Sequence, residues 1–375
     1  MRKLLFLVFI SFIFLSCSSI KQTEEKAIPK LTLVSSFEIP FNQEFKNTLI
    51  GGLSGIDYNA EKQLYYFICD DRAVYNDARF YTAKIHLSPN AIDSIAFKSV
   101  VSFKNAVGEK YSNWEQTPAS SIDPEDMRFN PKTNTLVWIS EGARLVTPNI
   151  TVLQDPTIQT ADLNGNFVND FHLPGNLRMQ KEEQGPRNNS VLEGLTFDSK
   201  YKTLYGNIEE PLYEDDSPAN LIKGGLIRLY EFDAKSRKNT AQYAYLLDPI
   251  AHEPKPKEAF AVNGVSALQY YGKDQLLVVE RSYSTGTQAC TIKVYLCDVS
   301  KATDLKNIAS LKKQTYRLAS KKLILNMDDL GIFIDNIEGV TFGPKLANGK
   351  QSLLFVSDNN FSAKQKTQIL LFEVD

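Results

Sequence analysis

One sequence pattern recurs five times along the chain and constrains its fold more than any other feature. Each copy starts with a short apolar stretch that opens on a polar residue, passes through a turn, and ends in a second apolar stretch closed by polar residues. The copies occupy residues 53–72, 124–144, 192–211, 262–282 and 337–360. Aligned on the opening polar residue, they lie 71, 68, 70 and 75 residues apart. Such a period is typical of repeat architectures, in which each repeat is one supersecondary unit.

Each copy is predicted to be a β-hairpin followed by further strands. The third copy, LEGLTFDSKYKTLYGNIEEP, shows this most clearly: two stretches rich in Leu, Tyr, Phe and Ile flank the turn DSKYK. Polar residues of this kind are typical of hairpin turns, and the flanking composition is typical of strands. Two more strand-like stretches follow most copies; after the second copy they are residues 150–153 and 157–163. A period therefore holds about four strands.

Four-stranded antiparallel units repeated along a chain predict an all-β fold, the β-propeller. Five copies predict five blades, and a sixth, degenerate blade is the alternative. The last copy has only three strands before residue 375, whereas residues 31–39 form a strand before the first copy. We expect this N-terminal strand to complete the last blade, because pairing the two ends of the chain removes exposed sheet edges. Residues 30–375 would then form a single propeller domain.

The first residues are predicted to be a targeting segment rather than part of the fold. Arg2 and Lys3 precede an apolar stretch, residues 4–15, which is too short to span a bilayer comfortably. Small residues and Cys17 follow, and this arrangement resembles a bacterial lipobox. The resemblance implies a signal peptide over residues 1–16, lipid attachment to Cys17, and a protein anchored to a membrane of the cell envelope. A plain secretory signal is the alternative. The polar residues 17–29 are expected to be a flexible tether.

Charge and cysteine content exclude several classes of partner and site. The chain carries 42 basic and 44 acidic residues, a net charge of −2, and this balance does not suggest nucleic-acid binding. Export implies an oxidising compartment. Cys290 and Cys297 lie in one predicted strand, roughly 23 Å apart at the rise of a strand, which is beyond the reach of a disulfide. Together with Cys69, they are expected to be free thiols.

The repeat predicts that polar residues gather at one end of the propeller axis. Neighbouring strands of a blade are antiparallel, so the start of the first strand and the end of the second lie at the same rim. The two positions are separated by 16, 16, 16, 17 and 20 residues in the five copies. The residues that open the first strands are, copy by copy, Ser54; Glu125 and Asp126; Glu193; Asn263; and Glu338. The residues that end the second strands are Asp70, Asp71 and Arg72; Glu141 and Arg144; Glu209 and Glu210; Glu280 and Arg281; and Asp358. Long polar insertions lie on this rim too, as expected of a binding site on a rigid scaffold.

So many carboxylates repel one another unless cations or arginines compensate them. The set offers oxygen ligands, which favour a hard cation such as Ca²⁺. We expect a catalytic group around this ion formed by Glu125, Asp126, Glu193 and Glu338, with further metal ligands or a general base among Asp70, Asp71, Glu209 and Asp358. Histidine-liganded zinc is not favoured, because the three histidines lie outside the repeat: His86, His172 and His252. Alternatively, each Glu that opens a first strand accepts backbone N–H groups from the next blade and only ties the ring together.

Three arginines and one asparagine are candidates for binding a substrate. Arg72, Arg144 and Arg281 would hold an anionic group through forked hydrogen bonds, or they would neutralise neighbouring carboxylates instead. The glycine that follows most opening residues suits close backbone approach at the axis. No G-x-S-x-G sequence or Ser-His-Asp arrangement is visible, which argues against a serine esterase.

Several of these motifs together resemble the phytase-esterase-like family of secreted proteins (esterase-like activity of phytase). The matching stretches are LSGID, PEDMRFN, LEGLTFD, IEGVTFG and LFVSDNN, and they cover nearly all of the mature chain. The resemblance implies a propeller and the hydrolysis of phosphoric or related esters. In the first and fourth copies Ser54 and Asn263 replace Glu, which argues against a symmetric site.

Three functions are consistent with these observations. The first is a metal-dependent hydrolase acting on a small anionic or ester substrate, and it is expected to be a monomer. The second is a non-enzymatic surface propeller that binds a ligand or protein and holds structural calcium. The third is a lactonase-like sugar-acid hydrolase, for which Asn263 would suit the calcium site. Propellers host all of these roles, so the fold cannot decide among them.

Overall fold

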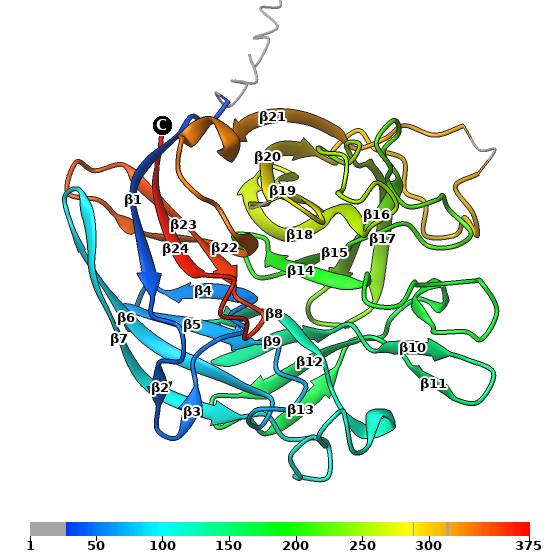
Figure 1. Cartoon of the computed structure of the whole chain (residues 1–375), viewed down its shortest axis with the longest axis horizontal. Coiled ribbons are helices and arrows are strands. Elements are labelled where there is room, and N and C mark those ends of the chain that lie inside the picture. Colours follow the sequence, from blue (N-terminus) through cyan, green and yellow to red (C-terminus); the bar gives the residue numbers. More distant parts are fainter. Residues whose placement is uncertain (1–27, 288, 313–314) are drawn as a thin grey trace, which may run out of the picture.

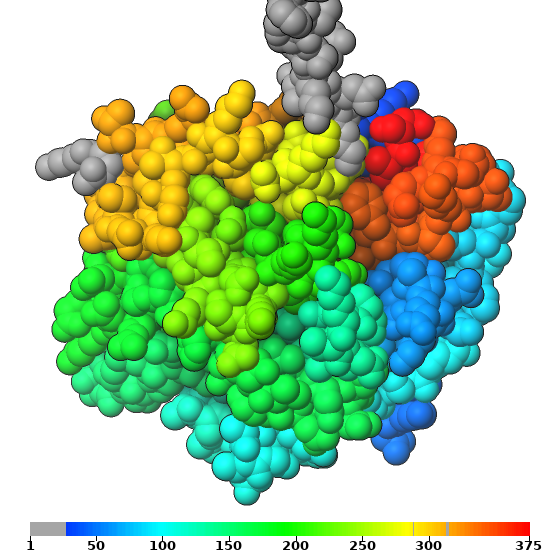
Figure 2. Space-filling model, turned by 180° about the vertical axis from the view of Figure 1, so that it is seen from behind, coloured from blue at the N-terminus to red at the C-terminus, as the bar shows by residue number. Residues whose placement is uncertain are grey.

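The computed structural model describes residues 28–375, except residues 288 and 313–314. In this part of the chain five four-stranded antiparallel sheets stand in a ring, and the remaining strands form two separate two-stranded hairpins rather than a sixth blade (Figure 1). The predicted five-bladed propeller is therefore confirmed. Seen from behind, the blades follow one another around the molecule in sequence order (Figure 2). Helical structure in the described residues is limited to short 3₁₀ turns at Pro118–Ser120, Gly175–Leu177 and Met327–Leu330, and none of it is long and apolar enough to cross a membrane.

Each blade has its first strand at the axis and its last at the outer edge. From the axis outward, the first three blades consist of β4 (Gly55–Asn59), β5 (Leu64–Cys69), β6 (Arg79–Ser88) and β7 (Ala91–Ser102); β8 (Pro124–Asn130), β9 (Thr135–Ser140), β12 (Thr157–Asp162) and β13 (Phe167–Asp170); and β14 (Leu192–Phe197), β15 (Thr203–Ile208), β16 (Leu226–Asp233) and β17 (Asn239–Leu246). The last two consist of β18 (Ala261–Gly272), β19 (Gln275–Ser284), β20 (Thr291–Asp298) and β21 (Ser320–Asn326); and β22 (Asn336–Lys345), β23 (Gln351–Asp358), β24 (Thr367–Val374) and β1 (Leu31–Ile39). A small hairpin, β2 (Glu44–Phe45) with β3 (Thr48–Leu49), lies between β1 and the first blade.

The N-terminal strand closes the ring as predicted. β1 pairs antiparallel with β24, from Leu31 opposite Val374 to Ile39 opposite Thr367. Figure 1 shows the two ends of the coloured chain lying side by side in the fifth blade. The pairing gives the fifth blade its fourth strand and leaves no blade incomplete.

The second blade differs from the prediction. Residues 150–153 were expected to form its third strand, but β11 (Thr151–Gln154) pairs with β10 (Ala143–Val146) in a separate hairpin. The third strand is β12 and the fourth is β13. The apolar residues of the hairpin, including Leu145 and Leu153, are exposed and contribute little to the core. Because β10 follows the second strand almost directly, β11 has a partner close in sequence and pairs with it rather than with the blade.

The hydrophobic core lies between neighbouring blades. One buried cluster joins Ile139 of the second blade, Leu195 of the third and Val278 of the fourth, and other clusters join the remaining neighbours. Between the first two blades the indole of Trp138 stacks on Phe103, with ring centroids 4.2 Å apart. Each blade is thus held by apolar faces on both sides, which provides a rigid frame for the residues at the axis.

A single ion pair at the axis connects all five blades. The guanidinium of Arg128 in β8 donates a 2.7 Å hydrogen bond to Asp126, and the other carboxylate oxygen of Asp126 accepts the N–H of Leu195 in the third blade at 2.8 Å. Arg128 also donates to carbonyls of the first, fourth and fifth blades, those of Ile56, Leu268 and Val340. The side chains of both Arg128 and Asp126 are buried.

Candidate active site

The glutamates that open the first strands project from β-bulges. In β14, Leu192 faces Ile208 and Gly194 faces Asn207, so Glu193 is the extra residue. Glu338 occupies the same place in β22, and the register of β8 shifts across Glu125 and Asp126. A bulge re-aims the side chain of its extra residue. The alternation of the strand is therefore broken at the residues that carry the carboxylates.

The glycine after the bulged glutamate allows the neighbouring blade to approach. A Cβ on Gly194 would lie 2.8 Å from the backbone nitrogen of Leu268, and one on Gly339 would lie 3.0 Å from that of Ile56. The first contact is closer than real side chains make and the second is closer than most of them make, and both are made with the first strand of the next blade. The predicted reason for these glycines, close backbone approach at the axis, is confirmed.

Five buried carboxylates form two overlapping groups that could hold a metal ion. One group consists of Asp123, Glu125 and Glu141, and the other of Glu141, Glu193 and Glu209. Within each group one oxygen from every residue lies within 4.8 Å of the others. Glu141 belongs to both groups and joins the second blade to the third. An all-oxygen, carboxylate-rich set of this kind suits a hard divalent cation.

Three more carboxylates extend this cluster: Asp358, which is buried, and Asp70 and Glu338, which are half-buried. Burial and then the charge of Glu338 raise the pKa of Asp70 well above its usual value. Burial and then the charge of Asp70 do the same for the pKa of Asp358. The cluster that we call the carboxylate mouth thus comprises Asp70, Asp123, Glu125, Glu141, Glu193, Glu209, Glu338 and Asp358.

The carboxylate mouth holds protons readily in the absence of a cation. Burial, followed by repulsion from Asp123 and Glu209, raises the pKa of Glu141 to about 8. Burial raises the pKa of Glu209 to about 7, although Arg281 opposes the shift. The pKa values of Glu125 and Glu193 are raised well above the usual range by the same two causes, burial and like charges. A metal ion would have to displace these protons, so its affinity should rise with pH.

Two arginines compensate part of this charge. Arg72 forms an ion pair with Asp123, and its guanidinium lies 5.2 Å from the centre of the Trp114 ring. Arg281 lies 2.5 Å from Glu209 and 3.9 Å from Glu338. Two guanidinium groups are too few to neutralise eight carboxylates once these are ionised.

A cavity of about 730 Å³ opens beside the mouth, between the third, fourth and fifth blades. Its walls include Glu209, Arg281 and Glu338 of the carboxylate mouth, together with the aromatic rings of Phe260 and Tyr283. The volume is within the range of small-molecule sites. The cavity therefore gives a ligand direct access to both the acidic groups and a guanidinium.

A family model decides the relationship of the chain to known proteins. The model described as "Phytase-like: Esterase-like activity of phytase" matches residues 48–361. The chain belongs to this phytase-like family. A relative from Arthroderma benhamiae, described as an uncharacterized secreted protein, is 32% identical over 136 residues. That match covers 34% of this chain and 26% of the relative, so the chain spans about a quarter of the length of the relative.

Solved structures similar to this phytase-like chain share only its general fold. The endo-arabinase of Bacteroides thetaiotaomicron is 10% identical with a TM-score of 0.43, covering 86% of this chain and 93% of the enzyme. The gluconolactonase of Xanthomonas campestris is 9% identical with a TM-score of 0.37, covering 92% of this chain and 90% of that one. Likeness at this level carries no argument about the chemistry.

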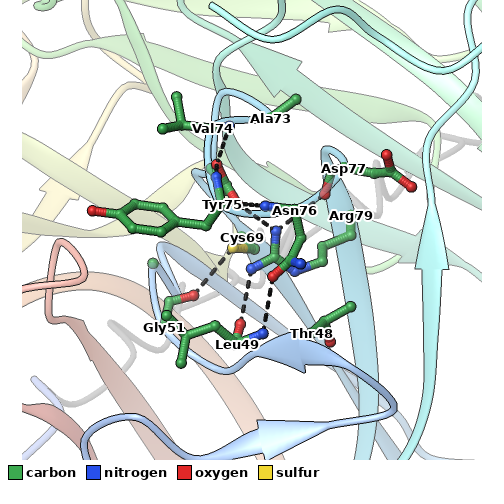
Figure 3. A network of polar contacts seen from close by, with 12 residues as sticks. Thr48, Leu49, Gly51, Cys69, Ala73, Val74, Tyr75, Asn76, Asp77 and Arg79 are labelled. Carbon is green, nitrogen blue, oxygen red and sulfur yellow. Dashed lines mark hydrogen bonds and ion pairs between the residues drawn. The ribbon is translucent and has the colours of Figure 1, made fainter.

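Asp71 of the phytase-like chain, predicted as a metal ligand, is engaged in a loop beside the mouth. Its carboxylate accepts the backbone N–H groups of Val74 at 2.7 Å and Asn76 at 2.8 Å, and pairs with Arg79 at 2.7 Å. Arg79 in turn donates to the carbonyl of Leu49 (Figure 3). These bonds order the segment that follows β5, and the role of Asp71 as a metal ligand remains a prediction.

Three other predicted site residues make contacts outside the carboxylate mouth. Asp126 is held in the axial ion pair. The guanidinium of Arg144 donates to the carbonyls of a loop, residues 180–182, and lies 5.0 Å from the centre of the Tyr213 ring. The amide of Asn263 donates to the carbonyl of Asp248 and to Glu280. Their predicted catalytic and binding roles remain predictions.

Two residues of the phytase-like mouth were not among the predicted site residues. Glu141 stands 16 residues after Glu125, as Glu209 stands after Glu193, so its repeat position could have identified it. Asp123 lies just before the second copy of the repeat, and nothing in the pattern marks it. The predicted free thiols are present, since Cys69, Cys290 and Cys297 are buried and unpaired. Cys17 lies outside the described residues.

Proposed function

We propose that this phytase-like propeller is a metal-dependent hydrolase of phosphoric or related esters, with its reaction at the carboxylate mouth. The observation that carries the proposal is the excess of carboxylates there: eight of them, six buried and two half-buried, face only two guanidinium groups. An arrangement of this kind is unfavourable in a fold unless it serves a cation. The adjoining cavity of about 730 Å³ supplies room for a substrate.

The donor set fits calcium. Ca²⁺ takes six to eight oxygen ligands, and the two overlapping carboxylate groups supply oxygen atoms from five residues. In the neighbouring part of the mouth, Oδ1 of Asp358 is buried and makes no hydrogen bond to the described residues. We propose Asp123, Glu125, Glu141, Glu193 and Glu209 as the residues that hold the cation.

A bound cation would polarise a phosphoryl or ester oxygen and lower the pKa of a coordinated water. The chain itself contributes charge recognition and a base. Arg281 lines the cavity, and its Nε is buried without a hydrogen-bond partner among the described residues. We propose that this nitrogen binds an anionic oxygen of the substrate. Glu338, held by the side-chain amide of Asn336 at 2.7 Å, would accept a proton from the attacking water.

A non-enzymatic ligand-binding propeller with structural calcium is the second candidate. Glu141 accepts the backbone N–H of Val191 at 2.6 Å, which ties the second blade to the third. The ring-tying alternative expects such a bond of the glutamates that open first strands, and here a carboxylate at the end of a second strand makes it. In that case the cation would strengthen the ring without any turnover.

The test measures turnover and stability on the same protein. The full chain, stripped with a chelator and then supplied with Ca²⁺, Mg²⁺, Mn²⁺ or Zn²⁺, is assayed on p-nitrophenyl phosphate, bis-p-nitrophenyl phosphate, phytate, p-nitrophenyl acetate and δ-gluconolactone. We expect calcium-dependent turnover of an ester, and a loss of about 100-fold or more in Glu193→Gln. The exposed Glu61→Gln is the matched control and should be unchanged. A calcium-dependent rise in melting temperature with no turnover of any substrate would instead establish the structural role, and lactone turnover alone would favour the lactonase alternative.

We also propose that the chain is exported and anchored by a lipid on Cys17, and that it acts as a monomer without nucleic acid. Support for export comes from the apolar segment before Cys17 and from the related protein that is described as secreted. A propeller tethered by residues 17–29 would meet substrates outside the cytoplasm.

A further inference from the structure

The propeller axis has a second opening, at the end opposite the carboxylate mouth. A cavity of about 890 Å³ lies there, where the first strand of each blade turns into the second. Every blade contributes an aromatic ring to its wall, from Tyr58, Phe129, Phe197, Tyr270 and Phe342, and the third and fourth blades each add a second ring, those of Tyr201 and Tyr271. We call this site the aromatic mouth.

The repeat itself builds the aromatic mouth. In four of the five copies an aromatic residue follows the opening polar residue by four positions, as Phe197 follows Glu193 and Phe342 follows Glu338. The first strand therefore carries a polar group to one end of the axis and a ring to the other. Tyr58, Tyr270 and Phe342 are only partly covered, whereas Phe129 and Phe197 also belong to the buried core between blades.

The rings are held in place by a second layer of aromatic side chains. Tyr58 packs on Tyr65 with centroids 4.6 Å apart, and Phe129 stacks on Tyr66 at 5.3 Å. Tyr270 stacks on a ring of the neighbouring blade, Tyr205, at 6.1 Å. Their faces are thus fixed before any ligand arrives, which reduces the entropy lost on binding.

Polar groups around the rings are numerous and balanced in charge. Arg128 and Lys273 line the cavity, and so do Asp57 and Asp198, so the aromatic mouth has no excess of either sign. Arg128 is 3% exposed, and its Nε makes no hydrogen bond within the described residues. The side-chain amides of Gln63, Gln269 and Gln351 complete the polar part of the wall.

The cavity continues outward over the first and fifth blades. A neighbouring cavity of about 310 Å³ shares Tyr58, Gln63 and Pro344 with it. Tyr65 lines this extension, and its hydroxyl is buried without a partner in the described part of the chain. The two cavities together form an elongated groove with an unpaired donor in each part.

We propose that the aromatic mouth binds a neutral oligosaccharide. Sugar rings present C–H faces that pack on aromatic faces, and hydroxyl groups that pair with amides, guanidinium and phenol groups. A purely apolar ligand would leave Arg128 and Tyr65 unpaired at a cost in free energy. An anionic ligand would meet Asp57 and Asp198 with no compensating positive excess. The elongated groove suits several sugar units better than one.

The experiment titrates the full chain with maltotetraose, cellotetraose, xylotetraose and chitotetraose, using calorimetry and saturation-transfer NMR. We expect at least one tetrasaccharide to bind, and Tyr270→Ala to weaken that binding by about tenfold or more. Tyr270→Phe keeps the ring and should bind within about threefold of the wild type. Melting temperatures of both variants show that they are folded.

Two controls separate this site from the carboxylate mouth. Phe260→Ala changes an exposed ring in the cavity beside the carboxylates and should leave saccharide binding unchanged, as should a chelator. The proposal is overturned if no tetrasaccharide binds at about 10 mM, a concentration at which even weak sites are seen. It is also overturned if Tyr270→Ala binds as well as the wild type, or if Phe260→Ala abolishes binding.

Discussion

Replacement of Arg128 by methionine should be among the most damaging single substitutions in this protein. The guanidinium connects the second blade with carbonyls of three other blades, and its partner Asp126 connects it with the remaining one. Removing one partner of a buried ion pair costs about 3–5 kcal/mol. Each carbonyl left without a donor adds about 1 kcal/mol or more. A total of at least about 5 kcal/mol approaches the entire stability of an ordinary domain, roughly 5–15 kcal/mol.

The cost should depend on pH in a defined direction. Burial raises the pKa of Asp126 to about 7 even with Arg128 beside it, and the pKa must rise further without the arginine. In Arg128→Met the carboxyl is therefore neutral in the folded state at pH 5, and the penalty of an unpaired charge is absent. The loss of stability should consequently be smaller at pH 5 than at pH 8.

A double-mutant cycle measures the coupling free energy between Arg128 and Asp126. Urea unfolding is followed by tryptophan fluorescence, which comes from Trp114 and from Trp138, buried against Phe103. The proteins compared are the wild type, Arg128→Met, Asp126→Asn and the double variant. The Asp126→Asn substitution removes the charge and retains an oxygen for the N–H of Leu195, so the double variant should be about 2 kcal/mol more stable than the sum of the single losses. Arg317→Met, at an exposed site, is the control and should cost less than about 0.5 kcal/mol. A loss below about 1 kcal/mol in Arg128→Met, or simple additivity in the cycle, would refute the axial role.

Three further predictions concern the mouth, its supporting loop and the anchor. In the folded protein the pKa of Glu141 is about 8 and that of Glu209 is about 7, so the stability they contribute is present below their unfolded pKa and is lost as pH rises through the folded values. The melting temperature measured in a chelator should therefore fall from pH 5 to pH 8. Added Ca²⁺ should restore the melting temperature most at pH 8. Asp71→Asn should destabilise the chain by about 2–4 kcal/mol in urea unfolding without abolishing calcium binding by calorimetry, because it leaves Arg79 buried without its counter-ion. Cys17→Ser should abolish incorporation of labelled palmitate and release the protein from membranes, and unchanged membrane association would contradict the lipid anchor.

The large-scale architecture could be predicted because the repeat expresses it five times. Each copy predicts the same first strand, turn and second strand, so an unclear strand assignment in one copy can be settled by comparison with the others. The second blade shows where this fails: residues 150–153 look like any half-buried strand, but they pair with β10, which lies close in sequence. Pairing decided by proximity of a partner is not visible in the composition of one strand.

The sequence could locate the candidate site at one rim, but it could not determine which of the polar residues at that rim face the mouth. The repeat places Glu193, Glu209 and Glu338 at one rim, but it gives the same rim to Asp71 and Asn263. Whether a polar side chain faces the mouth or is used by the fold depends on which backbone groups surround it. For Asp71 these groups come from its own loop, and for Asn263 they come from the segment around Asp248. Neither set of partners repeats between blades.

The departures from symmetry are what make a distinct site in a symmetric ring. If all five blades carried the same Glu at the start and the same acid at the end, no position around the axis would differ from another. In this chain Ser54 and Asn263 interrupt the ring, and Asn263 binds Glu280 so that the fourth blade presents no acid to the centre. The five closely grouped carboxylates consequently come from the second and third blades alone, with Glu141 between them. The arginine that lines the cavity beside the mouth comes from the fourth blade, where it lies across from Gly264, the residue after Asn263. The repeat builds the propeller scaffold. The copies that depart from the repeat, with Ser54 and Asn263 in place of Glu, make one side of the axis different, and there a substrate and a cation could be held side by side.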